Sequence, residues 1–162
     1  MLIRDLSSQE CQDFLTRVGI GRLACARDNQ PYVVPVYITY EPGRLYGFST
    51  VGQKIEWMRS NPLVCVEADE VRSHFDWQSV VIVGHYEEYP NTPQYKEARR
   101  YAEALLEKRF LWWQTAYAAQ QVRNHAPRTA PIFYCVHIKE ITGHRACPDP
   151  IEIAAGFAAP ST

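Results

Sequence analysis

The segment GFSTVGQKIEWMRSNP, residues 47–62, has the composition of a phosphate-binding turn. An expected strand ends at Ser49 and Thr50. After Gly52 a short helix is expected, with Lys54 in its first turn. Such a turn gathers free backbone N–H groups, two hydroxyls and an ammonium around one point, and the helix dipole adds positive potential. The spacing favours a phosphate site, although a capped helix with an early lysine also occurs without a ligand.

The cysteines and histidines do not indicate metal or disulfide chemistry. The cysteines are odd in number, lack a C-x-x-C pair, and are Cys11, Cys25, Cys65, Cys135 and Cys147. We interpret them as buried free thiols, since three lie in apolar runs typical of strands. The histidines, which show no metal-type spacing such as H-x-x-x-H, are His74, His85, His125, His137 and His144. We therefore expect no metal site, and only His74 stays a candidate for contact with a substrate.

Several short apolar or alternating runs are typical of β-strands. These segments are residues 19–26, 32–40, 44–49, 63–69, 77–89 and 131–141. The first two are expected to form a hairpin with Asp28 and Asn29 at its turn. Pro35 cannot donate a ladder hydrogen bond, so its strand is expected at an edge, in a bulge, or facing a ligand or partner. A polar loop over 70–76 is expected between the two clearest strands.

Three helices are expected between these strands. They follow the capping box of Ser7 and Glu10, an N-cap at Ser49 or Thr50, and the pair Thr92 and Pro93. Their expected ends are near Arg17, Asn61 and Arg109. The aromatic stretch 110–127 is either a helix or an ordered loop, and its Trp112 and Trp113 belong to a core or interface, or form a lid over a bound ring.

Strands in hairpin order lack the crossover helices that parallel pairing requires. We therefore predict a mainly β fold, a six-stranded antiparallel split β-barrel of Greek-key-like connection with about three helices. Residues 1–142 are assigned to this domain and residues 143–162 to a C-terminal extension.

Composition restricts the class of function. The chain has 162 residues, 46% of them hydrophobic and 22% charged, which is typical of one globular domain. Its 17 basic and 18 acidic residues are mixed along the chain, so no nucleic-acid surface is expected. No stretch approaches the roughly 20 apolar residues of a membrane span, and MLIRDLSSQE is not a signal peptide. We expect a cytoplasmic protein without a membrane partner.

Three segments together resemble the flavin-binding split-barrel family of pyridoxamine 5'-phosphate oxidases, particularly its nitroimidazole-resistance-like branch. The similarity covers about residues 6–141 and is carried by GRLACARDNQPYVVPVYITYE, GRLYGFSTVGQKIEWMRSNPLVCVEAD and WQSVVIVGHYEE.

The resemblance implies a flavin mononucleotide (FMN) at the interface of a homodimer. The residues that it places at the cofactor are Val34, Pro35, Val36, Phe48, Ser49, Thr50, Lys54, Trp77, Gln78 and Ser79. Lys54 matches the lysine that grips the phosphate. The branch commonly has arginine where this chain has Gln78, so Arg59 or Arg22 could serve as the second phosphate cation only where the fold brings one of them close.

The resemblance thus predicts an FMN-dependent oxidoreductase, with the hydride or electron chemistry carried by the cofactor. Its substrate would be a nitroaromatic-like small molecule or a pyridoxine-type compound, with NAD(P)H as a possible electron donor. No residue stands out as a catalytic acid, base or nucleophile, so a flavin-binding or flavin-sequestering protein without turnover stays open. A haem or deazaflavin in the same barrel is a further alternative.

Overall fold

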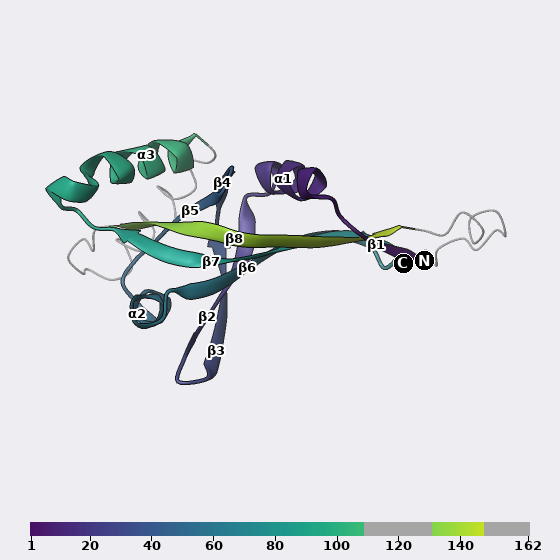
Figure 1. The fold of residues 1–162 in the computed structure, drawn as a ribbon, viewed down its shortest axis with the longest axis horizontal. Coiled ribbons are helices and arrows are strands. Elements are labelled where there is room, and N and C mark those ends of the chain that lie inside the picture. The colour runs from purple at the N-terminus through teal and green to yellow at the C-terminus, as the bar shows by residue number, and fades with distance from the viewer. Residues whose placement is uncertain (109–130, 148–162) are drawn as a thin grey trace, which may run out of the picture.

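One antiparallel sheet organises residues 1–108 and 131–147, which are the residues that this computed structural model describes (Figure 1). Its strands are β1 (Leu2–Asp5), β2 (Ile20–Arg27), β3 (Gln30–Tyr37), β4 (Thr39–Glu41), β5 (Arg44–Ser49), β6 (Leu63–Ser73), β7 (Asp76–Tyr89) and β8 (Ile132–Cys147). Their order across the sheet is β3-β2-β6-β7-β8-β5-β4, with β1 paired to the far end of β8. The long strands β7 and β8 form the middle of this path.

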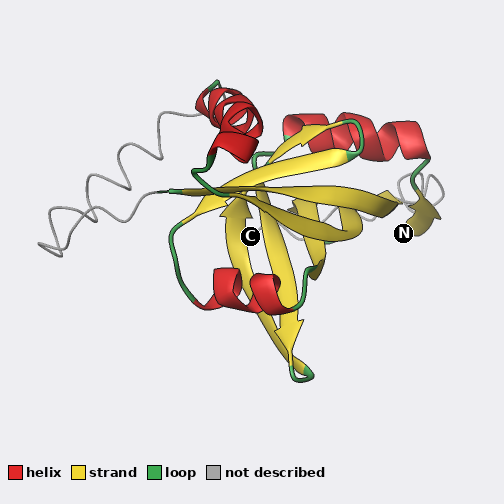
Figure 2. Cartoon of the chain, turned by 60° about the vertical axis from the view of Figure 1, so that its left-hand side comes forward, coloured by secondary structure: helices red, strands yellow, loops and turns green. Residues whose placement is uncertain are grey.

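The helices lie on both sides of the sheet. Figures 1 and 2 show α1 (Ser8–Arg17) and α3 (Lys96–Glu107) on one side of β8 and α2 (Gln53–Ser60) on the other. A short 3-10 turn, η1 (Pro93–Tyr95), precedes α3. The larger core cluster joins the curled sheet to α1 and α2, and a second cluster lies between α3 and strands β5, β7 and β8.

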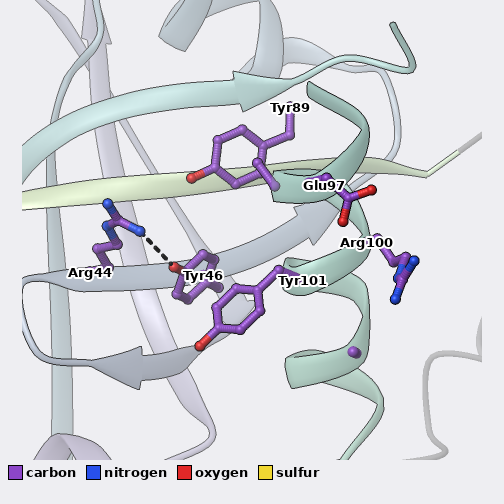
Figure 3. A pocket seen from close by; sticks show the side chains of 8 residues that line it. Arg44, Tyr46, Tyr89, Glu97, Arg100 and Tyr101 are labelled. Atoms are coloured by element: carbon purple, nitrogen blue, oxygen red, sulfur yellow. Dashed lines mark hydrogen bonds between the residues drawn. The ribbon is translucent and has the colours of Figure 1, made fainter. Parts of the chain in front are cut away.

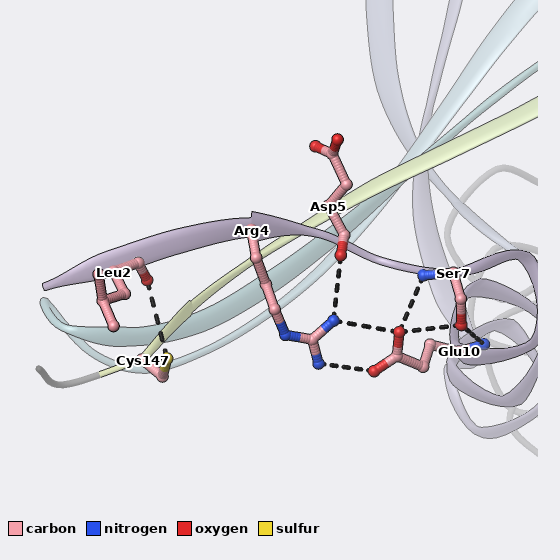
Figure 4. Close-up of polar contacts among 6 residues, drawn as sticks. All are labelled: Leu2, Arg4, Asp5, Ser7, Glu10 and Cys147. Atoms are coloured by element: carbon pink, nitrogen blue, oxygen red, sulfur yellow. Dashed lines mark hydrogen bonds and ion pairs between the residues drawn. The ribbon is translucent and has the colours of Figure 1, made fainter. Parts of the chain in front are cut away.

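Two local sequence signals are confirmed. Ser7 caps α1, and the Glu10 carboxylate accepts from the Ser7 backbone, which completes the predicted capping box (Figure 4). Arg4 donates to the same carboxylate at 2.6 Å and lowers the pKa of Glu10 to about 2. Asp28 and Asn29 have φ values of 52° and 63°. Both therefore adopt the left-handed conformation of a tight hairpin turn between β2 and β3.

For the described residues, the predicted antiparallel, mainly β fold with three α-helices is confirmed. The predicted number and bounds of the strands differ from those in the structure. The run 32–40 is divided between β3, which pairs with β2, and β4, which pairs with β5. Strand β1 was not indicated because all its residues are exposed. Within residues 1–108 and 131–147 the sheet therefore has eight strands, not six, and its hydrogen-bonded path ends at β3 and β4 without closing.

Two boundaries also differ from the sequence prediction. Strands β6 and β7 continue through most of the expected loop 70–76, so only His74 and Phe75 form the turn. Strand β8 continues to Cys147, and its last residues pair with β1 and β7. Residues 143–147 therefore lie in the sheet, although the sequence analysis assigned them to the extension.

Replacing Tyr134 with phenylalanine is expected to stabilise the fold by about 1 kcal/mol, because a buried hydroxyl without a partner keeps its desolvation penalty. The Tyr134 side chain is 2% exposed, and its hydroxyl has no hydrogen-bond partner among the described residues. The matched control is Tyr86→Phe, since the Tyr86 hydroxyl donates to Glu88 at 3.0 Å. Urea denaturation should show opposite changes in unfolding free energy for the two variants, and a destabilised Tyr134→Phe protein would contradict the expectation.

Candidate functional site

The predicted phosphate turn connects β5 to α2. Ser49 is buried, and its hydroxyl donates to the Thr50 carbonyl at 3.0 Å. The prediction that Ser49 or Thr50 caps the helix is wrong, because the chain continues as a bend and Gly52 is the N-cap, without a side-chain hydrogen bond. The Gly52 carbonyl accepts from residues 55 and 56. The first N–H groups of α2 thus have no side-chain cap, which suits an anion at the helix start.

Lys54 is the cation of this turn. Its side chain is half-buried, and burial lowers the pKa of its ammonium. Its charge acts on Cys25 of β2, which places the ammonium on the side of the helix that faces β2. Among the described residues no carboxylate forms an ion pair with Lys54. A partly desolvated ammonium without a counter-ion is stabilised by a bound anion, so these residues fit the phosphate of a flavin nucleotide.

Neither arginine considered as a second phosphate cation is available. Arg22 pairs with Glu67 at 3.0 Å and also with Asp69. Arg59 donates two hydrogen bonds of 2.7 Å to the carboxylate of Glu88. Both guanidiniums are therefore already bound by carboxylates.

Arg27 is a cation that the sequence analysis missed. Its guanidinium lies 5.3 Å from the centre of the Trp57 ring, and Trp57 is one turn along α2 from Lys54. Arg27 also lies 3.8 Å from the carboxylate of the exposed Asp28, a longer contact than the pairs of Arg22 and Arg59. Side chains on a helix lean toward its N-terminus, so the Trp57 ring lies toward the Lys54 end. Arg27 also shares a strand face with Cys25, since side chains alternate along β2. The alternation of side chains along β2 could have indicated Arg27 from the sequence, because it puts Arg27 on the same face as Cys25, which Lys54 approaches.

The segment Val34–Val36 lies on β3, which forms an end of the sheet path. Pro35 is exposed and stands opposite Arg22 of β2, its only pairing strand among the described residues. Of the three alternatives that Pro35 left open for its strand, the described sheet shows an edge. Val34 stands opposite Leu23, which is two residues from Cys25 on β2. Strand β3 also contacts β5. Strand β3 therefore lies beside β5 and α2, the two elements that flank the phosphate turn.

Phe48, like Ser49, lies at the end of β5, but its side chain is on the opposite face of the strand from Ser49. Its ring packs against Phe133, with 6.3 Å between ring centres, and contributes to the cluster under α3. Its backbone still joins the turn at Ser49.

Trp77, Gln78 and Ser79 lie far from the phosphate turn. Across the sheet, Phe48 is aligned with Phe133 and through it with Tyr89, at the end of β7. Ser79 lies near the start of β7, roughly 33 Å away along the strand at about 3.3 Å per residue. There the Gln78 amide donates to Glu70 at 2.9 Å. Along β7 these residues thus lie at the opposite end from the position aligned with Phe48, whereas across β2 and β6 Pro35 is aligned with Val81, two residues from Ser79.

A separate cavity of about 480 Å³, which we call the α3 pocket, lies between α3 and the sheet (Figure 3). The residues that define it are Arg44, Tyr46, Tyr89, Glu97, Arg100 and Tyr101. The sequence analysis did not indicate this pocket, because it arises where α3 packs over β5 and β7.

Comparison with known proteins identifies the family. Residues 7–145 match the family model of pyridoxamine 5'-phosphate oxidase, and the chain belongs to this family. The uncharacterized protein RA0666 of Rhizobium meliloti (strain 1021) is 42% identical over 147 residues, which are 91% of this chain and 97% of that protein.

Solved structures agree with this assignment. A FAD-binding protein of Mesorhizobium loti has 41% identity and a TM-score of 0.73, with 91% of this chain and 99% of that chain covered. A candidate 5-nitroimidazole antibiotic resistance protein of Bacteroides thetaiotaomicron has 22% identity and a TM-score of 0.64, with 90% and 89% covered. At that identity the second likeness concerns the fold alone.

Two sequence predictions concern other parts of the chain. Trp112 and Trp113 lie outside the described residues. No helix in the ranges 1–108 and 131–147 is long and apolar enough to cross a membrane.

Proposed function

We propose that this protein is an FMN-dependent oxidoreductase whose flavin lies at the interface of a homodimer. The observation that carries the proposal is the half-buried ammonium of Lys54, which lacks a carboxylate partner among the described residues and lies at a helix start without a side-chain cap. A phosphate there would meet an ammonium and free N–H groups together. Arg27 is the second cation in this proposal, because the phosphate of a flavin nucleotide carries nearly two negative charges at neutral pH.

The FAD-binding protein of M. loti supports a flavin as the cofactor class, since it is 41% identical over almost its whole length. FAD shares its isoalloxazine ring and first phosphate with FMN, so Lys54 would serve either nucleotide. We choose FMN because the described turn offers one compact cationic group, Lys54 with Arg27.

The separation of Trp77–Ser79 from Phe48 along β7 supports the homodimer, because a second chain can present Trp77–Ser79 to a flavin held by Lys54. The edge strand β3 offers a surface for such pairing, with Val33 58% exposed and Pro35 exposed beside it.

The proposed reaction is the reduction of a small aromatic compound, such as a nitroaromatic, with NAD(P)H as donor; oxidation of a pyridoxine-type substrate is its alternative. When bound, the flavin supplies the hydride and electron chemistry. In this proposal Lys54 and Arg27 hold the phosphate, and the backbone of Val34–Val36 and Phe48–Thr50 positions the ring. We place this activity in the cytoplasm, since all five cysteines are free thiols, as in reducing compartments.

Flavin content and turnover test the proposal together. The purified protein, or the protein reconstituted with FMN, should contain one flavin per chain and oxidise NADH or NADPH in the presence of a nitroaromatic acceptor. Mass spectrometry of the released cofactor distinguishes FMN from FAD. Stoichiometric flavin without turnover would indicate a flavin-binding protein instead, and absence of flavin uptake, with a haem or deazaflavin spectrum or none, would overturn the proposal.

A further inference from the structure

The α3 pocket lies apart from the proposed flavin site. Arg44, Tyr46 and Phe48 alternate along one face of β5, whereas Ser49 faces the other side. The pocket is therefore reached from the α3 side of the sheet. Its volume of about 480 Å³ is within the usual range of roughly 300–1,000 Å³ for small-molecule sites.

Three tyrosine rings form rigid walls in this pocket. Tyr46 is 1% exposed and meets Tyr101 edge-on, with 5.9 Å between ring centres. The Tyr101 hydroxyl donates to Glu41 at 2.7 Å, which holds the outer ring in place. Tyr89 is also buried, and its hydroxyl is hydrogen-bonded to the thiol of Cys135. The aromatic surface is thus formed in the free protein, as ligand sites usually are.

The arginines at the pocket differ from several other described arginines, although Arg99 and Arg145 likewise have no carboxylate partner among the described residues. Arg4, Arg17, Arg22 and Arg59 each have a carboxylate within 4 Å. Among the described residues no carboxylate pairs with Arg44 or Arg100. The contact of Arg44 is instead the Tyr46 hydroxyl, at 3.5 Å. An unpaired guanidinium beside aromatic rings suits a carboxylate, which it can bind through two parallel hydrogen bonds.

The two ends of the pocket are chemically different. Arg44 comes from the sheet side and points toward the tyrosines, whereas Glu97 and Arg100 lie together on α3 at the other end (Figure 3). An anionic group is favoured at Arg44. At the other end the charges of Glu97 and Arg100 offset one another, and the Glu97 carboxylate can accept a hydrogen bond there.

We infer that the α3 pocket binds a small aromatic carboxylate, with its acid group on Arg44, its ring among Tyr46, Tyr89 and Tyr101, and a donor substituent toward Glu97. This site goes beyond the proposed flavin chemistry and does not depend on it. The ligand class follows from the guanidinium at one end, the aromatic walls and the carboxylate at the other.

Calorimetric titration of the full chain with 4-aminobenzoate, benzoate and benzamide tests the inference. We expect saturable binding of one molecule per chain, in the order 4-aminobenzoate, benzoate and then benzamide, with NMR shifts at Ala98 and Ala104 of the pocket wall. Arg44→Gln should weaken binding of both carboxylates roughly tenfold to a hundredfold. The matched control, Arg72→Gln, removes an exposed guanidinium outside the pocket and should leave these affinities unchanged.

The outcomes separate this site from the flavin site. Arg44→Gln should bind FMN as the unmodified protein does, which also shows that the variant is folded. No saturable carboxylate binding, equal affinity for benzoate and benzamide, or unchanged affinity in Arg44→Gln would each overturn the inference. If the unmodified protein binds 4-aminobenzoate but does not bind flavin, the proposed function alone is overturned.

Discussion

Lys54→Ala is expected to raise the Kd for FMN roughly tenfold to a hundredfold, because it removes a charge-assisted contact worth about 1.5–3 kcal/mol. Riboflavin lacks the phosphate, so its Kd should stay within about twofold of the unmodified protein's value. Quenching of flavin fluorescence on titration into apo-protein measures both constants. Lys139→Ala is the matched control, since Lys139 is exposed on β8, away from the turn. Equal losses for FMN and riboflavin would show that Lys54 does not bind the phosphate.

The same contact predicts a pH dependence. Burial lowers the pKa of Lys54 in the free protein, and a bound phosphate would raise it again. Affinity for FMN should therefore fall as the pH rises through the lowered pKa of Lys54, earlier than for an exposed lysine. Ionisation of the flavin ring affects FMN and riboflavin alike, and above about pH 7 the FMN phosphate is almost fully ionised, so the ratio of their Kd values isolates the lysine in that range. That ratio should become independent of pH in Lys54→Ala.

Arg27→Gln extends this experiment to the second cation. We expect a smaller loss of FMN affinity than for Lys54→Ala, because Arg27 is about half exposed and a contact there is more screened by solvent. Riboflavin affinity should again be unchanged. Arg59→Gln would instead break the pair with Glu88 and destabilise the fold, so it is not a suitable probe of the phosphate.

The parts of the fold that could be predicted from the sequence depend on neighbours in the chain. The capping box of Ser7 and Glu10 and the hairpin turn at Asp28 and Asn29 each involve residues at most three positions apart. Pro35 restricts its strand to an edge, a bulge or a surface facing a ligand or partner by its chemistry alone, because it lacks an N–H to donate. Such features need no knowledge of the rest of the structure.

The parts that could not be predicted depend on pairing between distant residues. Strand β1 pairs Leu2 with Cys147, and its exposed residues carry no hydrophobic pattern that reveals this. The same holds at the candidate site. The proposed phosphate turn is one continuous segment and could be proposed from the sequence, whereas the position of Trp77 depends on the register of β7 along β8. Arg27 was missed because its proximity to Trp57 arises from packing of α2 on β2.

The register of β7 along β8, which sets the position of Trp77, leads to a prediction for the dimer. If Lys54 and Trp77 at one flavin come from different chains, chains carrying Lys54→Ala and Trp77→Ala should complement one another. Each variant homodimer should bind FMN weakly, roughly tenfold or more below the unmodified protein, because a buried aromatic contact is worth about 2 kcal/mol or more. Their heterodimer then has one site with both substitutions and one site with neither. It should bind one FMN per dimer with the unmodified affinity.

A site formed within each chain gives a different result. Every site of the heterodimer would then carry one substitution, and no high-affinity binding would return. Co-expression with two affinity tags isolates the heterodimer, and fluorescence titration counts its tight sites. A heterodimer of Lys54→Ala with the unmodified chain is the control, since it has one intact site in either arrangement. A chain that sediments as a monomer with and without FMN would exclude the shared site, whereas FMN-dependent dimerisation would support it, because a ligand that binds only the dimer stabilises it by mass action.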